Sequence, residues 1–394
     1  MQHPPLEAAD LVRAAGEDFL VRSRKWLRGQ HRKVLSAIVR CRTPALGGHR
    51  LRCDGCDHQP PIVYNSCLDR HCPKCQAGAR KRWLEARRRE LLPVRYLHLV
   101  FTLPRVLSQL ALQNKKLLYS LLLKASAETL LEVARDPRRL GAKLGFLSIL
   151  HTWNQRLQAH AHTHLVVPAG GLALDHSRWI DAPSKSFFLP KRVLAEVFRG
   201  KFVDGLKKAY AKGKLHLHGR FAPLQRERDF KALVRSLYRT KWVVEVRPPF
   251  GGAGKALEYL SRYTHRAAIS NQRLVSLEQG RVTFRWRDSA HGNQQRLMTL
   301  ELYEFLRRFL LHVLPSGFHR IRYWGFLANP NRGKLLPLCR RLIARVNPSR
   351  RITLPDQDPV RSGWACPRCG GRVRIVERFS AAELRARSPP ALAA

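Results

Sequence analysis

The chain has 394 residues and carries 73 Lys and Arg against 28 Asp and Glu, a formal net charge of +45. This excess disfavours an ordinary enzyme for small neutral substrates and favours a polyanion as the partner. With 44% hydrophobic and 26% charged residues the chain has the composition of a folded protein. Disorder of the whole chain and a low-complexity basic tail are therefore both disfavoured.

The length suggests two or three domains at about 150 residues per domain. No apolar stretch approaches the roughly 18 residues of a membrane span. Residues 117–123, for example, are followed directly by Lys124. The N-terminus lacks the basic segment and apolar core of a signal peptide. We therefore expect a cytoplasmic protein without a membrane partner.

Six of the nine cysteines lie between Cys41 and Cys75. Because the cytosol keeps thiols reduced, metal binding is a better interpretation than disulfides. Cys53-x2-Cys56 and Cys72-x2-Cys75 are separated by fifteen residues. This spacing predicts one closed, tetrahedral zinc site of four thiolates, as in a zinc ribbon.

Further candidate ligands lie near these two pairs and at the other end of the chain. Cys41, Cys67 and His71 could contribute to a second zinc site, or the two thiols could simply be buried. Cys366-x2-Cys369 resembles half of a ribbon. It could bind a metal ion together with ligands from elsewhere in the chain, or it could form a Cys-x2-Cys turn without a metal ion.

A basic segment, residues 79–91 (ARKRWLEARRREL), follows the last of these cysteines. Its spacing predicts an amphipathic helix with Trp83, Leu84 and Leu91 on one side. Such a charge run is often only a solvated face, but its position after a zinc module favours DNA contact. The candidate DNA-binding residues are Arg80, Lys81, Arg82, Arg87, Arg88 and Arg89.

From Val94 onward, short apolar or alternating runs predict strands, and leucines at three- and four-residue spacing predict helices. The predicted strands are 96–102, 146–151, 162–167, 241–247 and 320–324, with a hairpin of 274–277 and 282–286. The predicted helices are 107–135, 251 to about 265, 300–311 and 333–346. This order predicts an α+β fold with an antiparallel sheet.

His160, His162 and His164 occupy alternate positions, so on a strand their side chains project from one face. Neighbours lie about 6.6 Å apart along the strand, close enough for one adjacent pair to share a metal ion. The site could therefore use either adjacent pair, His160 with His162 or His162 with His164. His216 and His218 form a second His-x-His, but it leads straight into a glycine and ranks below the first.

Tyr259 and Tyr263 lie four residues apart and share one face of a predicted helix. Aromatic residues at this spacing often belong to a core, but Arg262, His265 and Arg266 surround these two with basic residues. A tyrosine is a poor nucleophile with a pKa near 10, yet it can attack a phosphodiester whose oxygens a metal polarises. Arg262 and Arg266 are further candidates for DNA contact.

These motifs together resemble the rolling-circle insertion-sequence transposases of the two-tyrosine HUH class, the insertion sequence 91-like family. The resemblance rests on the cysteine segment from Cys53 to Cys75, on HTHLVV at 162–167 and on residues 248–271, and it extends from about residue 10 to residue 345. It implies an HUH-type antiparallel sheet flanked by helices and preceded by a small zinc-ribbon-like domain. The expected domains are 1–92, 93–314 and a basic section 315–394.

The resemblance also implies an activity, rolling-circle transposition in a bacterial cell by single-strand DNA nicking and strand transfer through 5′-phosphotyrosine links. Tyr259 and Tyr263 match the paired nucleophiles, and His162 and His164 match the ligands of a catalytic Mg²⁺ or Mn²⁺. The implied partner is DNA, mainly single-stranded, and no nucleotide cofactor is implied. Structural zinc is the second implied metal.

Some alternatives stay open at this point. The third ligand of the catalytic metal is unassigned among His160, Glu258 and His265. Imidazole suits Zn²⁺ or Mn²⁺ better than Mg²⁺, in tension with the family's use of Mg²⁺. The alternative functions are a rolling-circle replication initiator and a non-catalytic, zinc-dependent DNA-binding regulator.

Overall fold

The computed structural model describes residues 4–183, 190–247, 254–255, 258, 268–288, 291–348 and 364–387. The chain divides into two compact units, one of residues 1–82, 265–313 and 353–394 and the other of residues 83–264 and 314–352. The expected division into domains 1–92, 93–314 and 315–394 stays a prediction. Both ends of the chain belong to the first unit.

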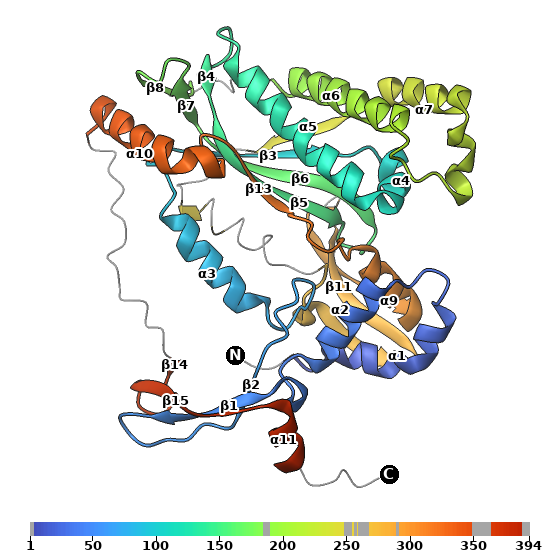
Figure 1. Ribbon diagram of the computed structural model, residues 1–394, viewed down its shortest axis with the longest axis vertical. Coiled ribbons are helices and arrows are strands. Elements are labelled where there is room, and N and C mark those ends of the chain that lie inside the picture. Colours follow the sequence, from blue (N-terminus) through green and yellow to red (C-terminus); the bar gives the residue numbers. More distant parts are fainter. Residues whose placement is uncertain are drawn as a thin grey trace. The chain divides into compact units, whose positions relative to one another are not determined.

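The second unit contains a five-stranded antiparallel sheet with the order β13-β5-β6-β3-β9 (Figure 1). Its strands are β3 (Tyr96–Thr102), β5 (Gly145–Trp153), β6 (Ala159–Pro168), β9 (Val243–Arg247) and β13 (Ile321–Gly325). All five correspond to predicted strands, and the antiparallel α+β prediction is confirmed. A smaller sheet in this unit has the order β4-β7-β8, formed by Ala142–Lys143, Gly170–Ala173 and Trp179–Asp181.

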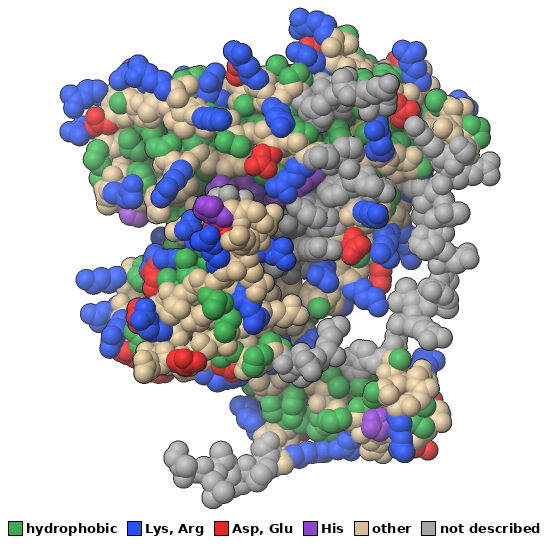
Figure 2. Space-filling model, turned by 180° about the vertical axis from the view of Figure 1, so that it is seen from behind, with side chains coloured by type: hydrophobic (Ala, Val, Ile, Leu, Met, Phe, Trp, Pro, Cys, Tyr) green, Lys and Arg blue, Asp and Glu red, His purple; other side chains and the backbone are tan. Residues whose placement is uncertain are grey.

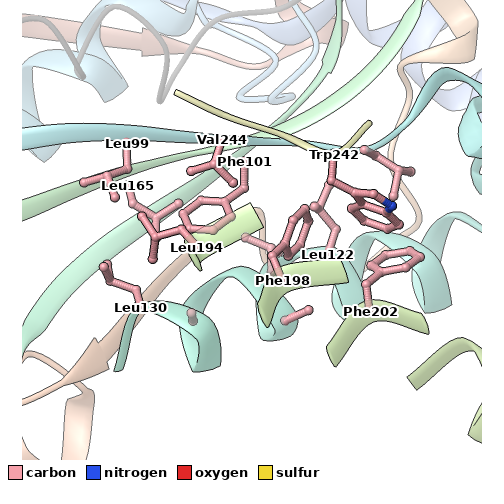
Figure 3. Close-up of a cluster of buried hydrophobic side chains, with 14 of the residues drawn as sticks. Leu99, Phe101, Leu122, Leu130, Leu165, Leu194, Phe198, Phe202, Trp242 and Val244 are labelled. Atoms are coloured by element: carbon pink, nitrogen blue, oxygen red, sulfur yellow. The ribbon is translucent and has the colours of Figure 1, made fainter. Parts of the chain in front are cut away.

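Helices cover one face of the five-stranded sheet with a large apolar core. Phe101 of β3 makes an edge contact with Phe198, and Trp242 contacts both Phe198 and Phe202 (Figure 3). The covering helices are α4 (Ser108–Gln113), α5 (Lys115–Arg135), α6 (Lys191–Ala211) and α7 (Glu227–Arg239). The predicted helix 107–135 is therefore interrupted at Asn114 but ends before Asp136-Pro137 as expected.

Alternation along the strands places a second set of apolar side chains on the opposite face. Leu147 and Ile149 of β5 and Val166 of β6 pack there in a cluster with Leu336 and Leu342. The last two belong to α10 (Asn329–Val346), which corresponds to the predicted helix 333–346. This smaller cluster occupies only part of the face, and the histidines of β5 and β6 lie on the same face further along the strands.

The first unit combines helices with two small sheets. The hairpin of β10 (Leu274–Glu278) and β11 (Arg281–Asp288) turns at Gln279 and Gly280, both with positive φ, and is extended by β12 (Gln294–Glu301). The predicted helix 300–311 begins only at Leu302, because the preceding residues pair with β11 as a strand. The helices are α1 (Ala8–Arg22), α2 (Gly29–Arg40), α9 (Leu302–Leu311) and α11 (Ala381–Arg387).

The other sheet of this unit joins strands from the two ends of the chain. Its order is β14-β15-β1-β2, formed by Trp364–Ala365, Arg372–Phe379, Gly48–Cys53 and Val63–Tyr64. β1 and β15 pair antiparallel although more than 300 residues separate them. Helix α3 (Gln76–Arg88), the predicted basic helix, begins in the first unit and ends in the second.

No helix in the described part of the chain is both long and apolar enough to cross a membrane. Lys and Arg side chains greatly outnumber Asp and Glu on the face shown in Figure 2, as the composition requires.

Candidate metal centres and active site

Three histidines meet on one face of the five-stranded sheet. The register pairs His151 of β5 with His162 of β6, and His164 lies two residues further along β6. Ring centroids are 4.5 Å apart for His151 and His164, 4.8 Å for His162 and His164 and 5.3 Å for His151 and His162. One ring nitrogen from each lies within 4.8 Å of the others, so the three imidazoles could bind one metal ion.

Hydrogen bonds orient two of these rings. His162 Nδ1 lies 2.9 Å from the carbonyl oxygen of His160, which requires Nδ1 to donate and leaves the Nε2 lone pair free for a metal. His164 Nδ1 lies 2.8 Å from Nε2 of His98 on β3. A partner on the second ring nitrogen is the usual way in which a ligating imidazole is held in orientation.

Burial keeps these imidazoles neutral. Desolvation lowers the pKa of His162 to about 3 and of His98 to about 4, and it lowers the pKa of His164 well below its ordinary value. A neutral imidazole is the form that binds metal. His162 and His164 are therefore in the form that can accept a cation at neutral pH.

Among the described residues, only two of the histidines that the sequence analysis singled out belong to this cluster. His162 and His164 belong to the cluster, whereas His160 has an exposed side chain and is not one of the three grouped histidines. His216 and His218 are also exposed and belong to none of the possible metal-binding groups in the described residues. Thr163, between the two ligating positions, is buried on the opposite face, where it donates to Ser126 Oγ at 3.2 Å.

Two residues of this site escaped the sequence analysis, His151 and His98. Both lie inside predicted strands, and His151 closes the run FLSILH, but only the pairing of β5 and β3 with β6 brings them to the cluster. Glu258 is helical and exposed and belongs to no such group. Tyr259, Tyr263, Arg262, His265 and Arg266 lie outside the described residues.

The cysteines form two groups of four rather than the predicted single site. Cys53 and Cys56 do not join Cys72 and Cys75, so the expected pairing of the two Cys-x2-Cys motifs is wrong. The groups are Cys41, Cys67, Cys72 and Cys75, and Cys53, Cys56, Cys366 and Cys369. The reason is that the pairing of β1 with β15 brings Cys53 and Cys56 to Cys366 and Cys369, while Cys72 and Cys75 lie just before α3.

The group formed by Cys41, Cys67, Cys72 and Cys75 has the geometry of a zinc site. Cys41 follows α2, Cys75 precedes α3, and the Sγ atoms of Cys67 and Cys75 lie 3.7 Å apart. Four sulfurs at about 2.3 Å from a shared zinc ion would be about 3.8 Å apart.

His71 is not one of the grouped ligands. Its ring is buried, and Nδ1 lies 3.0 Å from Asp69 Oδ1. The two remaining candidate cysteines, Cys41 and Cys67, complete the group instead.

The basic side chains of helix α3 and the residue after it lie in two different environments. Arg87 donates to the Tyr323 hydroxyl at 2.6 Å and pairs with Glu90 at 3.1 Å, so it is held within the second unit. Trp83 packs against the smaller apolar cluster. The other five candidate DNA-binding side chains of this segment are exposed: Arg80, Lys81, Arg82, Arg88 and Arg89.

Comparison with known families and proteins points in one direction. A family described as "Putative transposase" matches residues 145–334, and a family described as "Transposase zinc-binding domain" matches residues 11–103. A "Putative transposase y4qJ" of Sinorhizobium fredii is 47% identical over 382 residues, 95% of each chain. The transposase for insertion sequence element IS801 of Pseudomonas savastanoi pv. phaseolicola is 30% identical over 308 residues, 77% of this chain and 72% of the relative. No solved structure matches.

Proposed function

The chain belongs to the insertion sequence 91-like transposases with an amino-terminal zinc-binding domain, and from this premise we propose that it transposes DNA by rolling-circle, single-strand nicking and strand transfer. The observation that carries the proposal is the cluster of His151, His162 and His164 on one sheet face. Three imidazoles grouped on one face of a sheet support a metal-dependent reaction better than a purely structural role.

The nature of the donors suggests which cation the cluster takes. His151, His162 and His164 supply three nitrogen donors, which suit Mn²⁺ better than Mg²⁺, since Mg²⁺ prefers oxygen ligands. A divalent cation held there would polarise the oxygens of a scissile phosphate. We therefore propose His151 as the third ligand and, of the two catalytic ions that the family resemblance implies, Mn²⁺ as the favoured one. His98 serves as a positioning residue for His164.

The proposed nucleophiles are Tyr259 and Tyr263, which lie at one-turn spacing in the sequence. The phenolic oxygen of one tyrosine forms a bond to phosphorus while the bond from phosphorus to the 3′ oxygen breaks. The 5′ phosphate then remains on the tyrosine, and the leaving 3′ oxygen takes up one proton, balancing the one that the phenol gives up, to become a hydroxyl. Because the phosphotyrosine link conserves the phosphodiester, a second 3′ hydroxyl reverses the step without a nucleotide cofactor.

Two tyrosines allow two strands to be held at once. The second phenol cleaves the next junction while the first remains linked, and the free 3′ hydroxyls resolve the two links. A replication initiator shares this chemistry. The zinc-binding domain matched at residues 11–103 favours the transposase over the initiator.

The test is formation of a covalent adduct. Full-length protein is incubated with Mn²⁺ and single-stranded DNA from the element ends, and the products are separated on a denaturing gel. We expect adducts with the unmodified protein, and none with Tyr259→Phe combined with Tyr263→Phe. Tyr238→Phe, which changes an exposed tyrosine of α7, is the matched control and should keep full adduct yield.

Two results would contradict the proposal. Adducts that persist in the double variant would remove the tyrosines from the chemistry. Loss of DNA binding by the double variant, measured separately by fluorescence anisotropy, would assign the tyrosines to packing and favour a non-catalytic DNA-binding protein.

A further inference from the structure

Two Cys-x2-Cys turns from opposite ends of the chain meet at the end of a strand pair. β1 finishes at Cys53, which lies opposite Val373 of β15, and Cys56 follows in the turn after β1. On the other side Cys366 and Cys369 lie between β14 and β15. The antiparallel pairing of β1 with β15 therefore brings the two turns to the same point.

The four sulfurs have the separation expected for a shared metal. The Sγ atoms of Cys53 and Cys369 are 3.4 Å apart, and those of Cys56 and Cys366 are 3.7 Å apart. All four lie within 4.8 Å of one another. A disulfide would require about 2.05 Å, whereas a tetrahedron of sulfurs around zinc gives about 3.8 Å. Each of these two short distances joins a sulfur of one turn to a sulfur of the other turn. The four sulfurs therefore form one group rather than two separate motifs.

The backbone around these sulfurs is arranged to stabilise thiolates. Backbone N–H groups donate to the sulfurs from Gly55 to Cys53 at 3.3 Å, from Arg368 to Cys366 at 3.4 Å and from Gly371 to Cys369 at 3.4 Å. Hydrogen bonds to the charged form favour it. Both turns make such bonds, as expected if both supply ligands to one cation.

The backbone at Gly371 passes close to the sulfurs of Cys369 and Cys53. A Cβ atom at this position would lie 3.2 Å from the Cys369 sulfur and 3.4 Å from the Cys53 sulfur. The first of these contacts is tighter than most Cβ contacts in proteins, and the second lies at the lower limit of ordinary van der Waals contact. Gly371, two residues after Cys369, therefore lies beside sulfurs from both ends of the chain, and a side chain there would press on them.

Apolar packing at this junction is small. Its buried members are Leu51, Cys53, Cys366 and Val373, with Cys56 and Val63 packed against them. Half of the buried members are themselves cysteines. The nearby ion pairs of Arg50 with Glu377 and of Arg374 with Asp54 involve partly exposed side chains, which contribute little. A cross-link through the sulfurs would stabilise a junction whose core is this small.

From these observations we propose that Cys53, Cys56, Cys366 and Cys369 bind one structural zinc ion that joins the amino-terminal zinc-binding domain to the carboxy-terminal segment. The matched families cover residues 11–103 and 145–334, so they include the first two ligands and neither of the last two. The zinc-binding domain is then completed by residues 364–379, at the other end of the chain. This proposal does not depend on the nicking chemistry.

The test counts zinc per chain in full-length protein by elemental mass spectrometry. Cys53→Ser and Cys366→Ser should each lose one ion, and the two together should still lose only one, because both substitutions empty the same site. Cys72→Ser combined with Cys366→Ser should lose two. Counts are compared as differences, so any zinc held by the histidine cluster is common to all variants.

Controls separate loss of a ligand from general damage. Cys339→Ala changes a buried cysteine of α10 outside both groups and should lose no zinc. Cys369→His should keep the ion lost in Cys369→Ser, because three cysteines and one histidine are an established structural zinc set. Cys369 has an exposed side chain, which leaves room for the larger ring.

A second measurement on unmodified protein covers variants that fail to fold. Zinc should protect Cys366 and the exposed Cys369 from alkylation together with Cys53 and Cys56, and a chelator should make all four reactive. The proposal would be overturned if the double variant Cys53→Ser with Cys366→Ser lost two ions, or if Cys366→Ser lost none. It would also be overturned if the mass of the unreduced chain showed a disulfide between two of these cysteines.

Discussion

His151 is the residue on which the assignment of the catalytic metal ligands depends most. It faces His162 directly across the strand pair, and its ring centroid lies 4.5 Å from that of His164. Loss of a residue that only orients a ligand typically costs about 10- to 100-fold in metal affinity. We expect His151→Ala to weaken Mn²⁺ binding by at least about 100-fold, measured by titration calorimetry, because it removes a ligand itself.

The matched controls for this prediction are two exposed histidines. His160→Ala and His216→Ala should change the Mn²⁺ affinity much less than His151→Ala, since neither side chain belongs to the cluster. If His160→Ala weakened binding as much as His151→Ala, His160 would have to be considered as a metal ligand, as the sequence suggested.

The histidine site shows what sequence reasoning can and cannot supply at this scale. The alternation of His162 and His164 is local information, because a strand places every second side chain on one face. His151 and His98 reach the same point only through the registers of β5 and β3 with β6. Strand register depends on pairing between distant segments, and one sequence does not fix it.

At the scale of the element, helix α3 contains both a basic residue with a structural role and basic residues that are free to contact DNA. Arg87 is engaged by Tyr323 and Glu90, whereas four other cations of the helix are exposed. We expect a variant with all four exposed cations replaced by Gln to bind single-stranded DNA more weakly and with a smaller dependence on salt. For every phosphate that the variant no longer neutralises, the slope of log K against log salt should fall by about 0.7. The substituted residues are Arg80, Lys81, Arg82 and Arg88.

The control variant removes the same number of exposed cations from α6 and α7. Its DNA affinity and salt slope, measured by anisotropy at several salt concentrations, should stay close to those of the unmodified protein. The control positions are Arg192, Lys208, Arg228 and Lys231. Equal losses in both variants would mean that total charge, rather than the surface of α3, determines binding.

Elements with a strong local signal were predicted well, and those defined by partners were not. β3 coincides with the predicted strand 96–102, and the Gln279-Gly280 turn lies where the hairpin was expected. β12 was missed because its exposed, polar residues gain strand structure from pairing with β11. All three Cys-x2-Cys motifs were recognised individually, but the grouping of the first with the last follows from the pairing of β1 with β15.

At the scale of the whole molecule, the two units are stabilised by different means. The second unit has an extensive apolar core between its sheet and helices, whereas the buried cluster at the cysteine-bearing end of β1 and β15 consists of Leu51, Val373 and two cysteines. Structural zinc contributes on the order of 10–16 kcal/mol to the folding of small metal domains. The junction should therefore depend on the metal, and the histidine-bearing sheet should not.

Removal of zinc by a strong chelator tests this difference in unmodified, full-length protein. Hydrogen exchange should show lost amide protection in β1 and β15, because the metal that we propose to hold their ends together is gone. β3, β5 and β6 should keep their protection, since their hydrogen bonds are backed by the large core. Restoring zinc should return the protection of β1 and β15. If β3, β5 and β6 lost protection along with β1 and β15, the zinc would support the whole molecule rather than the strand pair that joins the two ends of the chain.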